Sequence, residues 1–317
     1  TFLPEDTVPN NIEKRYLESF LTLFISFNLI RPCLWTNQYK GIKATKKERG
    51  FLPLQGLHLV INMKTIAVNS FKGGTAKTST TLHLGAALAQ YHKARVLLID
   101  FDAQANLTAG LGLDPDCYDS LAVVLQGEKN IEEVIRPIDS SGLDLIPADT
   151  WLERVEVSGS LAADRYSHER LKIILSKIEH RYDYVIIDTP PSLCWLTESA
   201  LIAAQHALIC ATPEFYSVKG LERLATFIQG ISSRHPLNIL GVTLSFWNYR
   251  GKNNAAFTEL IQKTFPGKLL NTRIRRDITI SEAAIHGKPV FSTAPSARAS
   301  EDYLKLTEEL LFLLSDM

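Results

Sequence analysis

The feature that most constrains the fold is a glycine-rich loop between a strand-like run and a helical pattern. Residues 65–70 form the strand-like run, Gly73 and Gly74 follow it, and a helical period begins near Thr78. Paired glycines let backbone N–H groups turn inward around phosphate oxygens, and the first turn of the next helix adds its positive dipole end. The segment therefore predicts a phosphate-binding loop that joins the first strand and first helix of an α/β domain.

Later segments repeat this change from a short apolar run to a longer helical pattern. Runs that are apolar on nearly every residue are typical of strands covered on both faces, and their alternation with helices predicts a doubly wound, mostly parallel sheet flanked by helices. The expected strands are residues 65–70, 96–100, 143–147, 184–188, 206–212 and 239–244, and the expected helices are residues 78–91, 168–179, 197–204, 218–232, 253–264 and 300–314. Ligands of such sheets bind beyond the carboxyl ends of the strands.

Composition excludes several classes of protein. The 317 residues are 45% hydrophobic, enough for a full core, and Lys plus Arg balance Asp plus Glu at 34 each, so no overall field draws the chain to nucleic acid or membrane. The longest apolar run, residues 16–30, is shorter than the ~20 residues of a membrane helix and contains Glu18. The cysteines lack paired spacing: Cys33, Cys117, Cys194 and Cys210. We therefore expect a cytoplasmic protein with free thiols and no membrane partner.

Residues 1–62 differ from the rest of the chain. They combine an aromatic, apolar stretch with the basic residues 40–49 and show no sustained helical or strand period. Met63 stands directly before the first predicted strand, where a compact domain would begin. We expect residues 63–317 to form the domain and Met63 to be the native start. The alternative is a real N-terminal extension, such as a DNA-binding arm, and a native peptide from within residues 1–50 would support it.

Side chains near the loop predict how a triphosphate would be held. Lys77 would reach the β- and γ-phosphates, and the Thr78 hydroxyl would hold Mg²⁺. Asp100 and Asp102 lie at the end of the second strand and point the same way, because side chains alternate along a strand. Asp188 ends another apolar strand before two prolines that stiffen the next loop, and it would hold Mg²⁺ through water.

Three segments resemble motifs of one protein family. The deviant Walker A loop of the ParA/Soj/MinD ATPases, K-G-G-x-G-K-[ST], is similar to residues 72–78. The family's D-x-D-x-Q-x-N-x-T switch is similar to residues 100–108, and its D-x-P-P-[SG] switch is similar to residues 188–192. Later motifs continue the resemblance, which covers essentially residues 63–317 and implies a P-loop NTPase fold of the deviant Walker A type.

The resemblance implies a role for each matched residue. Lys72 would cross a dimer interface to the phosphates bound by the partner subunit, and Asp102 would activate or orient the attacking water. The expected catalytic residues are Lys72, Lys77 and Asp102, and the expected metal ligands are Thr78, Asp100 and Asp188. The expected nucleotide-binding residues are Lys72, Gly73, Gly74, Thr75, Ala76, Lys77, Thr78, Ser79, Arg276 and Asp277, the last two beside the adenine.

Ala76 departs from the family pattern, which has glycine at this position. A methyl group in a tight phosphate loop either forces a backbone angle that glycine carries freely or crowds the nucleotide. We therefore expect weak nucleotide affinity or slow hydrolysis, and Ala76→Gly should raise ATP affinity or turnover.

The resemblance also implies a partitioning function with ATP and Mg²⁺ as cofactors. ATP binding would close a homodimer, which would bind non-specific DNA on the nucleoid, and a ParB-like DNA-binding partner would stimulate a slow hydrolysis that releases it. The cargo would be a chromosome or a plasmid. Late basic residues form the candidate DNA surface: Arg250, Lys252, Arg273 and Arg275.

Three alternatives remain at this point. A MinD-like division-site ATPase needs a basic amphipathic C-terminal helix, whereas residues 308–316 are acidic, so we expect that helix to dock on the core. An electron-transfer ATPase similar to the nitrogenase iron protein would use cysteines such as Cys117 and Cys194 for a cluster. The third is a nucleotide-binding interaction protein with little hydrolysis because of Ala76, which measured ATP turnover would separate.

Overall fold

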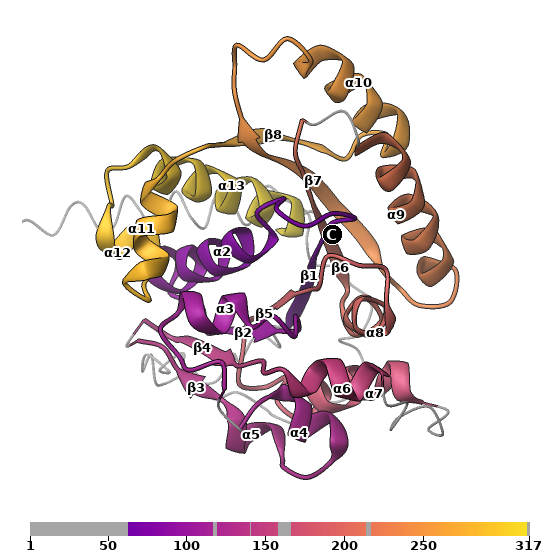
Figure 1. The fold of residues 1–317 in the computed structure, drawn as a ribbon, viewed down its shortest axis with the longest axis vertical. Helices are drawn as coiled ribbons and strands as arrows, with labels where there is room; N and C mark the ends of the chain where they lie inside the picture. Colours follow the sequence, from indigo (N-terminus) through magenta and orange to yellow (C-terminus); the bar gives the residue numbers. More distant parts are fainter. Residues whose placement is uncertain (1–62, 117–118, 140, 158–165, 214–216, 316–317) are drawn as a thin grey trace, which may run out of the picture. The chain divides into compact units, whose positions relative to one another are not determined.

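The computed structural model describes residues 63–116, 119–139, 141–157, 166–213 and 217–315 (Figure 1). The interpretations of residues 1–62, including Cys33, and of Cys117 lie outside the described residues and stay predictions. The strands are β1 (Lys64–Asn69), β2 (Val96–Asp100), β3 (Arg136–Pro137), β4 (Leu143–Ile146), β5 (Tyr184–Asp188), β6 (His206–Ala211), β7 (Asn238–Trp247) and β8 (Leu269–Arg275).

The helices alternate with these strands along the chain. They are α2 (Lys77–His92), α3 (Asn106–Gly110), α4 (Leu121–Gln126), α5 (Ile131–Val134), α6 (Trp151–Val157), η1 (Ser167–Glu169), α7 (Arg170–Ser176), α8 (Trp195–Ala203), α9 (Ser217–Ser232), α10 (Asn254–Thr264), α11 (Thr279–Ile285), α12 (Val290–Thr293) and α13 (Arg298–Ser315).

One eight-stranded sheet organises the described residues, in the order β3-β4-β2-β5-β1-β6-β7-β8. All neighbouring pairs are parallel except β3 with β4. β1 and β5 occupy the two central positions, and their carboxyl ends lie together because the two strands are parallel. This confirms the predicted doubly wound α/β fold, in which the crevice above the central strands is the ligand position.

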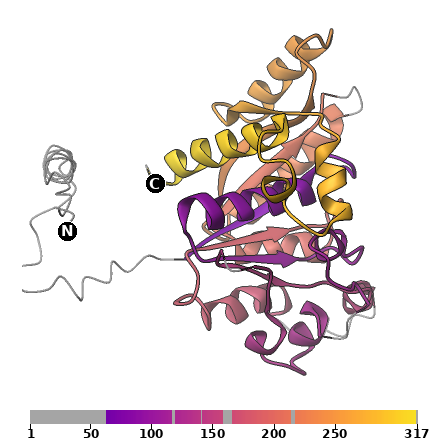
Figure 2. The ribbon, with the colours of Figure 1, turned by 90° about the vertical axis from the view of Figure 1, so that its left-hand side faces the viewer.

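Helices cover both faces of the sheet. On one face, α2 and α13 lie side by side with α3, α11 and α12 near them; Figure 2 shows α13 in yellow along α2 in indigo. The other face carries α8 and α9 together with α4 to α7 and α10. Both faces of the central strands are therefore buried, which explains why the strands are apolar on consecutive residues.

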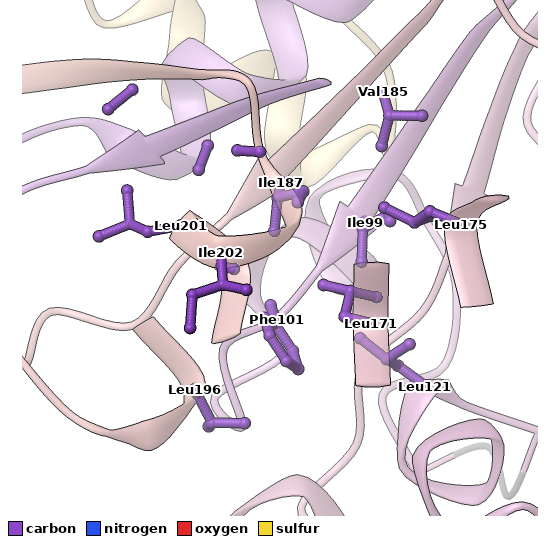
Figure 3. Packing of buried hydrophobic residues seen from close by; sticks show 14 of the residues in the cluster. Ile99, Phe101, Leu121, Leu171, Leu175, Val185, Ile187, Leu196, Leu201 and Ile202 are labelled. Carbon is purple, nitrogen blue, oxygen red and sulfur yellow. The ribbon is translucent and has the colours of Figure 1, made fainter. Parts of the chain in front are cut away.

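Alternation along each strand sends neighbouring side chains into different cores. In β2, Leu98 packs on the α2 face, whereas Ile99 packs on the α8 face with Val185 and Ile187 of β5. Figure 3 shows this second cluster, to which Leu201 of α8 also belongs. The same alternation decides which face receives each polar side chain at the strand ends.

The expected strands are all present within a few residues of their predicted bounds, but the two edge strands were not predicted. β3 is only two residues long and contains Pro137. β8 mixes polar and apolar residues because it lies at the sheet edge, where the Glu309 carboxylate accepts hydrogen bonds from the backbone N–H groups of Asn271 and Thr272. Short helices such as α4 and α11 were also missed, because fewer than two turns give too little periodicity to read.

The C-terminal helix is docked on the core, as predicted. Along α13, Tyr303, Leu306, Leu310 and Leu314 are buried beside α2. Its apolar face is therefore already used inside the domain. Among the described residues, no helix is both long enough and apolar enough to cross a bilayer.

Candidate nucleotide-binding site

The phosphate loop follows β1 and ends at the first turn of α2. Lys77 is 7% exposed, and its Nζ donates to the Ser70 hydroxyl at 3.2 Å, so the ammonium group lies inside the loop. The Ser70 hydroxyl in turn donates to the Lys72 carbonyl oxygen at 2.7 Å. Gly73 and Gly74 are exposed at the tip. The loop therefore holds a buried cation beneath an open, glycine-lined rim, as phosphate binding requires.

Ala76 adopts a left-handed backbone conformation, which is strained for any residue except glycine. Its φ is 65° and its ψ is 28°, in the left-handed region, and it caps the N-terminus of α2 without a side-chain hydrogen bond. Gly74, two residues earlier, has φ of 73°. The strain predicted at Ala76 is therefore present in the folded chain, because only glycine occupies this region without a steric cost.

The P-loop hydroxyl and the acid of β5 meet directly. Thr78 Oγ1 donates to Asp188 Oδ2 at 2.6 Å, and Thr81 Oγ1 approaches Asp188 Oδ1 at 3.4 Å. Asp188 is fully buried at the carboxyl end of β5. Two of the expected metal ligands are thus in contact, brought together from residues 110 positions apart.

Asp100 lies beside Asp188 on the neighbouring strand, since the two residues are paired in register between β2 and β5. Burial and then the charge of Asp100 raise the pKa of Asp188 to about 8, and burial raises the pKa of Asp100 to about 6. Hydrogen bonds from the backbone N–H and hydroxyl of Thr108 to Asp100 oppose the second shift. Burial disfavours the ionised forms of both carboxyl groups. A divalent cation bound between them would stabilise those ionised forms, so the pair fits such a cation.

Asp102 stands at the rim of this acidic pair. It is 9% exposed, its Oδ1 accepts the Gln104 N–H at 3.1 Å, and its own N–H donates to Asp100 Oδ1 at 3.3 Å. Ala105, which caps α3, has a left-handed φ of 50°. The carboxylate is therefore held by a tight, strained turn at the carboxyl end of β2, beside the other expected acids.

A second part of the site was only partly visible in the sequence. A pocket of about 670 Å³ opens where β6, β7 and β8 end. Its lining residues are Thr212, Pro213, Phe246, Trp247, Asn248, Tyr249, Arg250, Arg275, Arg276 and Arg298. The Arg276 guanidinium lies 5.2 Å from the centre of the Phe246 ring, and Phe246 has a left-handed φ of 53°. Aromatic rings and guanidinium groups both stack on nucleobases, so the side chains of this pocket could hold a base.

The structure treats Arg276 and Asp277 differently. Arg276 is exposed and lines the pocket. Asp277 instead accepts hydrogen bonds within the protein: from the N–H and hydroxyl of Thr279 at 3.2 and 3.0 Å, and from the Ala299 N–H at 3.3 Å. Its carboxylate thereby joins α11 to α13. The expected adenine contact of Asp277 stays a prediction, and its hydrogen bonds indicate that it supports the pocket wall.

The candidate DNA-binding residues also separate into two kinds. Arg250 and Lys252 are exposed. Arg275 is paired with Asp302 at 2.6 Å and Glu301 at 3.0 Å, which raise its pKa further above its usual range. Arg273 is half-buried, with its guanidinium 5.4 Å from the Trp247 ring centre. Arg250 and Arg275 share the pocket with Arg276, which sequence spacing could not show.

The electron-transfer alternative depends on cysteines, of which the structure describes two. Cys194 precedes α8 and is partly exposed, and Cys210 is buried in β6 with a pKa raised to about 12 by burial. Within the described ranges, no group of three or more His, Cys, Asp or Glu side chains is placed to bind a metal ion. The acidic pair of Asp100 and Asp188 would therefore depend on phosphate oxygens and water to complete a cation site.

A parallel sheet with this loop and these acids at its central strand ends defines the class of P-loop nucleotide-binding α/β proteins. A family model described as an AAA domain matches residues 63–239. A ParA family protein of Chlamydia trachomatis serovar D is 99% identical over 255 residues, covering 80% of this chain and 100% of that protein. The sporulation initiation inhibitor protein Soj of Bacillus subtilis is 36% identical over 251 residues, covering 78% and 98%. The chain belongs to the ParA family.

Solved structures agree with this assignment. An ATP complex of a Cyanothece McdA variant matches with a TM-score of 0.71 and 26% identity, covering 79% of this chain and 96% of that one. The septum site-determining protein MinD of Pyrococcus horikoshii, complexed with Mg-ADP, matches with a TM-score of 0.64 and 26% identity, covering 78% and 96%. The resemblance predicted from the motifs is thereby confirmed.

Proposed function

We propose that this chain is an ATP-switched partitioning ATPase. The observation that carries the proposal is the cluster at the ends of β1, β2 and β5, where buried Lys77 faces the phosphate loop and Thr78 contacts Asp188 beside Asp100. The ammonium group of Lys77 and several carboxylate oxygens lie beneath a glycine-lined rim. This is the donor set that a magnesium–triphosphate needs.

The position of each residue suggests its role in binding and hydrolysis. Lys77 and the loop N–H groups would bind the β- and γ-phosphates, while Thr78 and Asp188, supported by Asp100, would hold Mg²⁺. When bound, Mg²⁺ neutralises charge on the phosphate oxygens. Asp102, at the rim, would orient the attacking water and accept its proton, and the aromatic–arginine pocket containing Arg276 would hold the base.

Dimerisation and DNA binding are the outputs that we propose for this switch. Lys72 is exposed beside the loop, a position from which a lysine can reach a partner subunit. Arg250 and Lys252 are exposed near the base pocket, so a DNA surface there would lie close to the nucleotide. We include a ParB-like partner that stimulates slow hydrolysis, because the chain belongs to the ParA family.

The test measures ATP turnover by the full chain with Mg²⁺, alone, with non-specific DNA, and with DNA plus a ParB-like protein. We expect slow turnover that the partner raises. DNA binding should require ATP and fall steeply with salt, because it depends on phosphate contacts. Lys252→Glu should weaken DNA binding without changing ATP binding, because Lys252 is exposed and does not line the base pocket. Lys93→Glu is the control, since Lys93 is exposed at the opposite end of α2 from the loop. DNA binding that ignores ATP would contradict the proposal.

One observation favours a second candidate function. The left-handed Ala76 is a strained residue in the phosphate loop, which fits a nucleotide-binding interaction protein with little hydrolysis. The same turnover experiment separates the two candidates. ATP binding without turnover under any of the three conditions would favour the second.

A further inference from the structure

Residues 189–192, the loop after β5, form the switch loop. Its first residue, Thr189, holds the loop from the face of the sheet opposite to Asp188. Side chains alternate along the strand, so Asp188 points to α2, where it bonds Thr78, and Thr189 points to the α8 face. Thr189 is fully buried, and its Oγ1 lies 2.8 Å from the Val68 carbonyl oxygen and 3.1 Å from the Asn69 side chain. Two consecutive residues thus anchor the loop on both faces of the sheet.

The Thr189 hydroxyl and the Asn69 amide form one hydrogen-bond chain. A hydroxyl has a single proton, and the shorter contact gives it to the Val68 carbonyl. Asn69 is fully buried, and its Nδ2 has no partner in the described part of the protein when Oδ1 faces Thr189. Because heavy-atom positions do not distinguish amide oxygen from nitrogen, turning this amide over places Nδ2 as a donor to Thr189 Oγ1. Asn69 then donates to Thr189, and Thr189 donates to Val68.

The loop fixed in this way begins beside the end of β1 and runs near the phosphate loop. The Pro191 Cβ is 3.9 Å from where a Cβ on Gly73 would stand, so a side chain at Gly73 would contact the switch loop. At the other end of the loop, the Thr197 hydroxyl of α8 donates to the Ser192 carbonyl at 2.6 Å. Hydrogen bonds therefore hold the switch loop at both ends. The bond made by Thr189 is the one next to Asp188, an expected metal ligand.

We propose that Thr189, with Asn69 behind it, is a positioning residue for ATP hydrolysis. It acts through Asp188 and the following prolines, which it holds near Gly73, and it does not touch the nucleotide itself. This inference rests on the proposed ATPase function. It predicts that loss of the hydroxyl lowers the hydrolysis rate and leaves ATP binding nearly unchanged.

The test compares Thr189→Val, which keeps the shape and removes the hydroxyl, with Thr189→Ser, which keeps the hydroxyl. Single-turnover hydrolysis by the full chain with Mg²⁺ should fall about tenfold in Thr189→Val, the effect of one buried hydrogen bond on a barrier. Thr189→Ser should stay within about twofold of the unmodified chain. The dissociation constant of a non-hydrolysable ATP analogue should change less than about twofold in both variants.

Thr307→Val is the matched control. The Thr307 hydroxyl is also fully buried and donates to a backbone carbonyl, that of Tyr303 at 2.8 Å, but it lies within α13. It should lower stability as Thr189→Val does, without slowing hydrolysis. Asn69→Ala should slow hydrolysis as well, and the double variant with Thr189→Val should be no slower than Thr189→Val alone, because residues that act as one chain are not additive.

Full turnover in Thr189→Val, or equal slowing in Thr189→Val and Thr189→Ser, would overturn the proposal. If Thr189→Val does not fold, Asn69→Ala decides in its place, and a normal rate there would overturn the proposal. A wild-type chain that binds no ATP analogue would instead refute the proposed function, so the two failures are distinguishable.

Discussion

The phosphate end of the site is built from residues close together in the sequence, whereas the base end is assembled from separate segments. Residues 70–81 supply the loop, the buried lysine and the two hydroxyl groups that contact Asp188, all in one strand-to-helix turn. The base pocket instead joins residues 212–213, 246–250, 275–276 and 298. A local arrangement can be predicted from a sequence motif, because the backbone geometry of one segment places its groups. A pocket formed by long-range strand pairing cannot be predicted in this way.

Strain also separates the two ends from the rest of the chain. Of the non-glycine residues with positive φ in the described ranges, Ala76, Ala105 and Phe246 lie at the site, and only Lys93 lies away from it. Strained backbone of this kind persists where the surrounding structure holds it, often at functional positions. Both ends of the site carry this strain, even though only the phosphate end is a sequence motif.

The largest effect is expected at the rim of the phosphate end. Asp102→Ala should lower ATP turnover by about 10³-fold, the size of effect expected for loss of a general base, and should leave ATP binding nearly intact. Single-turnover rates and analogue binding measure the two quantities. Asp116→Ala, which removes an exposed acid from a following loop, is the control and should change neither. A normal rate in Asp102→Ala would remove Asp102 from the chemistry.

His83 joins the phosphate end to α12 and α13 and gives a pH dependence. Its ring bonds the Ser79 carbonyl at 2.6 Å and accepts the Val290 N–H at 3.1 Å, and it stacks on Tyr303 at 4.7 Å between ring centres. Burial lowers the pKa of His83 from 6.5 to about 4. A folded-state pKa below the unfolded value means that stability is complete above about pH 6.5 and is lost as the pH falls toward 4.

The measurement compares unfolding free energies of the unmodified chain and His83→Gln from pH 7 to 4. Their difference should shrink by about 3 kcal/mol, since one pKa unit corresponds to about 1.4 kcal/mol. Taking the difference removes the opposite contribution of Asp100 and Asp188, whose raised pKa values lower stability as the pH rises. The neutral Tyr303 hydroxyl does not titrate in this range, because burial raises its pKa. A constant difference would show that His83 is not buried and neutral.

Arg276→Ala tests whether the base end is a separate unit. It should weaken ATP binding about tenfold, the effect of losing one stacked cation, and should leave the binding of inorganic triphosphate unchanged. Lys252→Ala, which removes an exposed cation that does not line the pocket, should change neither. Equal weakening of ATP and triphosphate would mean that the pocket takes phosphate and not base.

The smallest effect is expected from Ala76→Gly. The loop already holds the left-handed conformation without a nucleotide, so relief of strain should raise the free energy of unfolding by about 1 kcal/mol. Chemical denaturation measures this gain. Measured ATP affinity and turnover test the separate expectation from the sequence that Ala76→Gly raises one or the other. Lys93→Gly relieves a similar φ of 56° away from the loop and should raise stability alone. A destabilised Ala76→Gly would contradict the account.

Sequence reasoning predicted the central strands, the fold class and the acids at the strand ends, because each depends on local pattern. The register that pairs Asp100 with Asp188, and the contact between Thr78 and Asp188, could not be predicted, since both depend on how distant segments pair. The candidate DNA surface shows the same limit. Spacing grouped Arg273 and Arg275 with Arg250, whereas tertiary packing places Asp302 against Arg275 and Trp247 beside Arg273.

One buried lysine and the adjacent carboxylates are proposed to hold a magnesium–triphosphate. Calorimetric titration of the full chain with a non-hydrolysable ATP analogue and Mg²⁺, repeated with Lys77→Ala, tests this arrangement. We expect saturable binding at one site per chain, at least about 100-fold weaker in Lys77→Ala, because that variant loses a buried, charge-assisted contact. No binding by the unmodified chain, or equal binding by both, would refute the proposed site.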